Sequence, residues 1–90
     1  MGVLIIHHKV ADFATWKPVY DGHDAIRKGA GLTKGHVFRG VDDPNMVTII
    51  LEFADRAKAE AFSASDNLKN AMKAAGVVGK PEIFMMTRAD

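Results

Sequence analysis

The chain has 90 residues, enough for one domain, residues 1–90, built around a single hydrophobic core. Apolar residues make up 48% of the sequence, which excludes a disordered chain, and the absence of cysteine excludes disulfides, thiolate catalysis and zinc–thiolate sites. The net charge is +1 and the basic residues are scattered, so we expect no nucleic-acid partner.

The first predicted element is a strand at residues 3–9, within MGVLIIHHKV. This start has no basic region or cleavage signal, and no apolar run in the chain is long enough to span a bilayer, so we expect a cytoplasmic protein without a membrane partner. Neighbouring strand residues point to opposite faces. His7 and His8 therefore cannot chelate one metal ion, and we expect no metal site.

A helix is predicted next, over residues 12–29. Asp12 is a suitable N-cap, and residues 29–31, Gly-Ala-Gly, are typical of a helix end. Pro18 and Gly22 interrupt the pattern, so we expect a kink or a start nearer Thr15. The residues at three- and four-residue steps form one stripe, which consists of Phe13, Trp16, Val19, Tyr20, His23, Ile26 and Ala30.

A β-hairpin follows, with arms at residues 32–40 and 46–53 and the turn residues Asp-Asp-Pro-Asn between them. Strict alternation places Leu32, Lys34, His36 and Phe38 on one face of the first arm. In the second arm both faces carry apolar residues, because Val47, Ile49, Leu51 and Phe53 share one face and Met46 and Ile50 lie on the other.

A second helical region is predicted over residues 55–75, with Asp55 as its cap and Gly76 at its end. Ser65 is a second capping candidate, which would divide the region into two helices. Residues 77–80 are predicted to be a linker, and Pro81 to open a last strand over residues 82–88.

The order β-α-β-β-α-β predicts an α+β, ferredoxin-like fold: one antiparallel four-stranded sheet with two helices on one face. The other sheet face would carry several apolar side chains with no cover from the chain. Such a patch is larger than monomers usually expose. We therefore expect a homodimer formed through the open sheet face.

With this element order, the chain resembles the dimeric α/β-barrel superfamily, and within it the antibiotic biosynthesis monooxygenase-like group. The resemblance rests on HHKVADFATWKPVYD, FRGVDDPNMVTIILEFADRAKAEAF and SDNLKNAMKAAGVVGKPEIF, which together span nearly the whole chain. The superfamily includes cofactor-free oxygenases of aromatic polyketides, haem-degrading enzymes and isomerases. Glu52 matches a glutamate of better-known members, whereas Phe62 stands at the position of their second-helix histidine.

The candidate site combines the helix stripe with the first hairpin arm. Trp16, Tyr20 and Phe38, together with the flexible side chains of Met72 and Met85, are predicted to bind a small apolar ligand. His23 and His36 are the candidate catalytic bases, since histidine titrates near neutral pH. The alternative is that these aromatic and histidine residues are ordinary core residues with satisfied polar tips.

Three functions fit this site. The first is a small monooxygenase-like enzyme that acts on an aromatic or polyketide-like molecule without a cofactor. The second is a non-catalytic homodimer that binds or senses a small molecule, which suits the missing second-helix histidine. The third is a protein that binds haem through one histidine.

Overall fold

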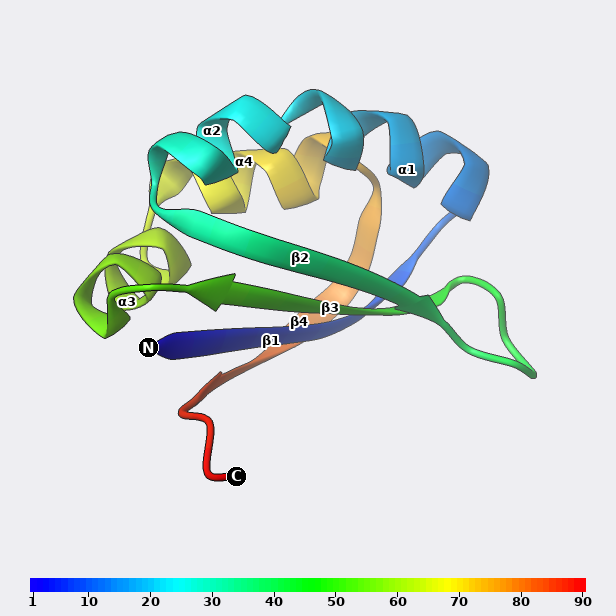
Figure 1. The fold of residues 1–90 in the computed structure, drawn as a ribbon. Helices are drawn as coiled ribbons and strands as arrows, with labels where there is room; N and C mark the ends of the chain where they lie inside the picture. Colours follow the sequence, from blue (N-terminus) through cyan, green and yellow to red (C-terminus); the bar gives the residue numbers. More distant parts are fainter.

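The structure is a computed structural model that describes residues 1–90. Figure 1 shows a single sheet with helices along one side of it and a further helix beside the strand ends near the N-terminus. Along the chain the elements are β1 (Gly2–Val10), α1 (Phe13–Gly22), α2 (Asp24–Gly29), β2 (Leu32–Arg39), β3 (Met46–Phe53), α3 (Arg56–Ser63), α4 (Asp66–Ala74) and β4 (Val77–Met86).

The sheet has the strand order β2-β3-β1-β4, and every neighbouring pair is antiparallel. This order confirms the predicted α+β, ferredoxin-like fold. The helix layer differs in one respect from the expected two helices, since each helical region is divided into two short helices. No helix is both long and apolar enough to cross a membrane.

The hydrophobic core lies between the helices and one face of the two central strands. β1 and β3 pair along their lengths, with Leu4 opposite Leu51 and Ile6 opposite Ile49. Side chains of both strands that face the helices are almost fully buried, and they comprise Leu4, Ile6, Val10, Val47, Ile49, Leu51 and Phe53. Each such side chain contributes about 1.5 to 3 kcal/mol through burial, so the central pair anchors the domain.

Side-chain caps define where the helices begin. Asp12 accepts a hydrogen bond from the backbone N–H of Ala14, so α1 begins at Phe13, and the prediction of a start nearer Thr15 is wrong. Pro18 is tolerated inside α1 because it and Ala14, whose carbonyl loses its helical partner, both lie on the exposed side. The helix ends at Gly22, and α2 starts after His23.

The second helical region confirms the alternative with two helices. Asp55 caps α3 through the N–H of Ala57, and Ser65 caps α4 through the N–H of Leu68. Gly76 follows α4 with a φ of +81°, a conformation that glycine adopts without strain.

The last strand begins earlier than predicted. β4 starts at Val77, so the prediction that residues 77–80 form a linker is wrong. Its pairing with β1 shifts register between His7 and Lys9, and Pro81 lies in the shifted stretch. A proline is tolerated there because β4 is an edge strand, where one residue without an N–H does not interrupt the sheet.

A second irregularity changes which side chains of β2 face the helices. Leu32 pairs with Phe53 and packs against the core, but the register then shifts before Lys34. The shift reverses the alternation for the rest of the strand, so His36 lies opposite Ile50 and Phe38 opposite Thr48. Lys34, His36 and Phe38 therefore lie on the face without helices, and the prediction that they share the face of Leu32 is wrong.

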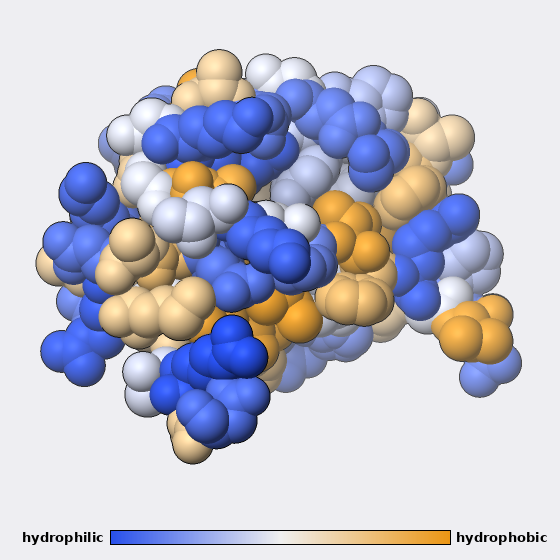
Figure 2. Space-filling view, in the orientation of Figure 1, coloured by the Kyte–Doolittle hydropathy of each residue, from blue (hydrophilic) through white to orange (hydrophobic).

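That face, which we call the open face, carries several apolar side chains, as predicted, and the structure shows that they come from all four strands. Its apolar residues are Val3, Ile5, Phe38, Met46, Ile50, Val78, Phe84 and Met86, and Phe84 is 42% exposed. Figure 2 shows apolar atoms around the strands, while polar atoms predominate over the helices. The hairpin loop between β2 and β3 projects at the right of the molecule (Figure 1), and Val41 in this loop is 99% exposed.

Candidate functional site

A pocket lies on the other side of the sheet, between the central strands and the helices. Its cavity volume is about 50 Å³, and the pocket is partly open to solvent. Twelve of its 16 lining residues are hydrophobic, and they come from β1, β3, α1, α2, α3 and α4. Such a lining favours an apolar ligand, so the few polar groups in it decide what else the ligand must carry.

One wall of the pocket is aromatic. Trp16, only 2% exposed, stacks on Tyr20 with ring centroids 5.0 Å apart and an interplanar angle of 21°. Phe13 also lies against Trp16, with ring centroids 5.6 Å apart and an interplanar angle of 33°. The three rings come together because helical residues three or four positions apart share one side of α1. A flat, rigid wall of this kind suits an aromatic ligand.

His8 extends this wall from the centre of the sheet. Strand alternation places it on the same face of β1 as Leu4 and Ile6, where it is 3% exposed and its ring lies 5.8 Å from that of Trp16. Neither ring nitrogen has a hydrogen-bond partner. Burial, and then the charge of His7, lower the pKa of His8 to about 4. Near neutral pH the imidazole is therefore uncharged and offers one donor and one acceptor to the pocket.

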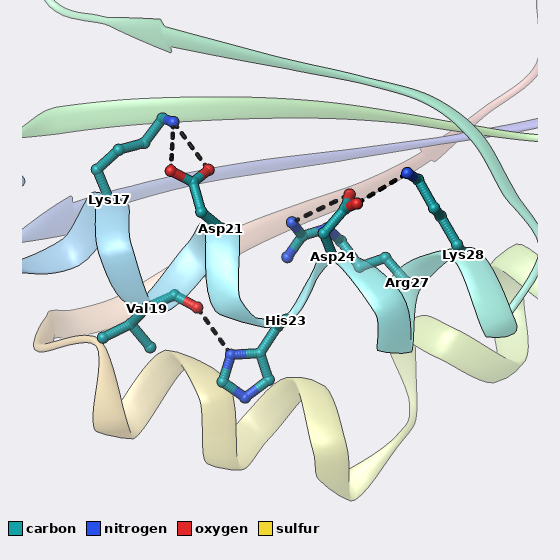
Figure 3. Close-up of polar contacts among 7 residues, drawn as sticks. All are labelled: Lys17, Val19, Asp21, His23, Asp24, Arg27 and Lys28. Atoms are coloured by element: carbon teal, nitrogen blue, oxygen red, sulfur yellow. Dashed lines mark hydrogen bonds and ion pairs between the residues drawn. The ribbon is translucent and has the colours of Figure 1, made fainter.

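Arg27 closes the opposite end of the wall. Its guanidinium carbon lies 3.7 Å from the centre of the Tyr20 ring, and the residue is 6% exposed. The nearest carboxylate is that of Asp24, 3.8 Å away, but Asp24 lies closer to Lys28, at 2.9 Å. Figure 3 shows Asp24 between these two cations. Nε of Arg27 is buried without a partner.

Tyr20 is half-buried between Trp16 and Arg27. Burial raises the pKa of its hydroxyl, against the lowering effect of the Arg27 charge. The phenol therefore stays protonated at neutral pH and can donate a hydrogen bond.

His23 stands at the junction of α1 and α2, and its ring lies between this junction and α4 (Figure 3). Its Nδ1 is 2.8 Å from the carbonyl oxygen of Val19. A carbonyl oxygen can only accept, so Nδ1 carries the proton. In the neutral ring the lone pair is then on Nε2, which remains available as a base or an acceptor.

The structure brings together four of the predicted site residues. Trp16, Tyr20, His23 and Met72 all line the pocket. Met85 packs against the core from β4 without lining it.

His36 and Phe38 lie on the open face, across the sheet from the pocket, because of the register shift in β2. Nε2 of His36 is 3.0 Å from a carboxylate oxygen of Glu52, and its ring stacks near Phe38 with centroids 6.4 Å apart. The expectation that these two residues face the first helix is wrong.

Sequence reasoning missed His8 and Arg27 as pocket residues. The alternation of β1 does put His8 on the face of Leu4 and Ile6, and this was the signal that it is buried toward the helices. Arg27 follows Tyr20 by seven residues, a helical spacing that puts both residues on one side, and this was the signal for it. Its contact with the Tyr20 ring forms across the break at His23.

The sequence matches no protein-family model and no curated protein. Similar folds are found among solved structures. SnoaB, a cofactor-independent oxygenase from Streptomyces nogalater, has a TM-score of 0.80 and 16% identity over 99% of this chain and 93% of its own. A Bordetella bronchiseptica protein, provisionally described as an antibiotic biosynthesis monooxygenase, has a TM-score of 0.82 and 13% identity over 98% of this chain and 96% of its own.

A further structure, described as an antibiotic biosynthesis monooxygenase, has a TM-score of 0.75 and 17% identity, and the match covers 100% of both chains. The chain has the fold of the antibiotic biosynthesis monooxygenases. The resemblance inferred from the sequence is thereby confirmed at the level of fold. At these identities the monooxygenase-like fold does not by itself carry over an activity.

Because His8 is buried, the free energy of unfolding should fall as the pH drops below neutral. Protonation of His8 is disfavoured in the folded protein but not in the unfolded chain, so its contribution to stability falls as the pH drops below about 6.5 and is lowest below about 4. Between pH 7 and pH 5, His8 should lower the free energy of unfolding by about 2 kcal/mol.

Urea unfolding at both pH values measures this loss in the wild-type protein and in His8→Gln, which cannot titrate. The variant should lose about 2 kcal/mol less than wild type over this interval. His7→Gln, on the opposite face of the same strand, is the control and should keep most of the wild-type loss, because burial is the larger cause of the lowered pKa of His8. An equal loss in wild type and His8→Gln would show that His8 is not held neutral by burial.

Proposed function

We propose that the chain is a small oxygenase that acts, without a cofactor, on an aromatic or polyketide-like molecule bound in the pocket. Support comes from an apolar pocket with an aromatic wall and polar groups at its margins. The fold is shared with SnoaB, which is described as a cofactor-independent oxygenase.

The observation that carries the proposal is the free Nε2 of His23 at the pocket wall. A cofactor-free oxygenation needs an electron-rich substrate anion, which forms when a base removes a proton from a phenol or an acidic carbon. His23 is held by the bond from Nδ1 to Val19, so that Nε2 is the nitrogen able to accept this proton. The apolar surroundings keep water away from the anion.

His8 is poorly suited to be this base. A general base works best when its pKa is close to the working pH, and burial holds the pKa of His8 at about 4. We therefore assign His8 to hydrogen bonding with the ligand and His23 to proton transfer. The Arg27 guanidinium and the Tyr20 hydroxyl are placed to stabilise negative charge on the ligand.

A non-catalytic ligand-binding protein is the second candidate. It is favoured by Phe62, which stands where related sequences carry a histidine. Phe62 packs on Phe53 with ring centroids 5.6 Å apart and lines the pocket with an apolar ring. It therefore adds apolar surface to the pocket but no proton acceptor.

The enzyme proposal is tested with 1,8-dihydroxyanthrone, an acidic aromatic compound whose CH₂ group is converted to a ketone by one O₂, with release of one water. We expect the wild-type protein to accelerate oxygen uptake above the uncatalysed rate. His23→Gln should lower this acceleration about 100-fold or more, since it removes the proposed base. Oxygen electrode traces and absorbance of the quinone product measure the two sides of the reaction.

His36→Gln serves as the control, since His36 lies on the open face and its replacement keeps a partner for Glu52. It should leave turnover unchanged. Equal loss in both variants would contradict the assignment of the base to the pocket. Saturable binding of the anthrone without any oxygen uptake would instead support the non-catalytic alternative.

We also propose that the protein is a homodimer formed through the open face. The face carries apolar side chains from all four strands, with Phe38, Phe84 and Met86 at least 42% exposed, and no element of the chain covers it. A second copy would cover the same surface with a matching one. Removing apolar surface from water supplies about 25 cal/mol per Å², which favours the assembly.

Phe84→Asp should convert the dimer to a monomer at micromolar concentration, because it would bury a carboxylate in an apolar contact. Phe84 is exposed in the single chain, so the fold should be retained. Val41→Asp, at the exposed loop tip, is the control and should remain dimeric. Sedimentation velocity distinguishes the two states. A monomeric wild-type protein would contradict the proposed assembly.

A further inference from the structure

Three buried polar atoms in the pocket wall have no hydrogen-bond partner, and they indicate which groups a ligand should carry. His8 and Arg27 lie at the two ends of the aromatic wall, with the stacked rings of Trp16 and Tyr20 between them. Both residues are more than nine-tenths buried and both line the pocket. Nδ1 and Nε2 of His8 and Nε of Arg27 are buried without a hydrogen-bond partner. Buried polar atoms normally have partners, so these three atoms are available to hydrogen-bond to a ligand in the pocket.

The charge at the Arg27 end is positive and incompletely neutralised. A guanidinium stays charged in proteins, and here its only nearby carboxylate is Asp24, at 3.8 Å. That carboxylate is shared with Lys28, whose Nζ is closer, at 2.9 Å. Two cations therefore share one carboxylate, and the excess positive charge lies on the buried Arg27. The planar guanidinium fits a carboxylate through two parallel hydrogen bonds.

The His8 end requires a neutral partner. The uncharged imidazole has one N–H and one lone pair, and nothing around it compensates a charge: its neighbours in the pocket are the apolar Ile6 and the Trp16 ring. His7 points to the opposite face, where its Nδ1 is 2.7 Å from the Thr48 hydroxyl. A hydroxyl group on the ligand could donate to or accept from His8 without bringing charge into this end.

We propose that the pocket selects an aromatic acid with two polar ends, a carboxylate that pairs with Arg27 and a hydroxyl that bonds to His8, with the ring system lying against Trp16 and Tyr20. This inference rests on the proposed function, because it uses the same pocket. It adds that the substrate is an anion on entry and that its orientation is fixed by two different contacts.

Three naphthalene probes separate the two contacts. 6-Hydroxy-2-naphthoate carries both groups at opposite ends of two fused rings, 2-naphthol lacks the carboxylate, and 2-naphthoate lacks the hydroxyl. Isothermal titration calorimetry of the full chain should give the tightest binding for 6-hydroxy-2-naphthoate. Loss of the carboxylate should weaken binding about tenfold or more, and loss of the hydroxyl by a smaller factor, since charged hydrogen bonds are the stronger ones.

Variants assign each contact to its residue. In Arg27→Met, 6-hydroxy-2-naphthoate should bind about as weakly as 2-naphthol, while 2-naphthol itself should bind as it does to wild type. In His8→Phe, the advantage of 6-hydroxy-2-naphthoate over 2-naphthoate should disappear, while the advantage over 2-naphthol should remain. Unchanged 2-naphthol binding by Arg27→Met also reports that the variant is folded. Arg27→Lys keeps the charge without the planar fork and should give an intermediate loss.

In these experiments the selection for an anion can fail while the binding of aromatic compounds remains. If all three probes bind wild type with equal affinity and Arg27→Met changes none of them, the pocket binds aromatic compounds but the selection for an anion is overturned. If no probe binds, the pocket is not a site for aromatic ligands, and both the inference and the proposed function fail. Binding that survives in a Trp16→Ala variant with the same preferences would place the probes elsewhere and would also overturn the inference.

Discussion

The pairing of β1 with β3 is the constraint on which the rest of the structure depends. These central strands bury one face under the helices, with Leu4, Ile6, Leu51 and Phe53 at most 1% exposed. The alternation that buries the leucines and isoleucines also buries His8, because it shares their face. A polar ring in this position costs free energy while its nitrogens are unpartnered, and a ligand bound in the pocket as proposed would lower that cost.

The break between α1 and α2 positions His23 and Arg27 in the pocket wall. Because α1 ends at Gly22, Arg27 folds back over the Tyr20 ring, and His23 is held at the junction by the Val19 carbonyl. The stack from His8 through Trp16 and Tyr20 to Arg27 thus joins the sheet to both helices. The same contacts that close the core on this side position the groups that a ligand would meet.

Much of the fold could be predicted from the sequence, because it depends on patterns that are local: apolar alternation in β1 and β3, the caps Asp12, Asp55 and Ser65, and the element order. The site could be predicted only in part. Trp16, Tyr20 and His23 share one helix side, and the structure brings them together in the pocket. His36 was misplaced because one register shift after Leu32 reverses the faces of β2, and alternation alone does not reveal such a shift. Helical spacing puts Arg27 on the side of Tyr20, but the contact between them also depends on how α2 follows α1 after the break at His23, which the spacing alone does not fix.

The state of the His8 ring tests this account most directly. Long-range ¹H–¹⁵N correlation spectra report whether each ring nitrogen is protonated, and they can be recorded at about pH 5, below the ordinary pKa of histidine. We predict that His8 remains neutral at this pH and that its ring nitrogen shifts change when 6-hydroxy-2-naphthoate binds. A His8 that is already protonated at this pH, or whose ring is unaffected by a bound ligand, would contradict the proposal that burial keeps His8 neutral and that it bonds to the ligand.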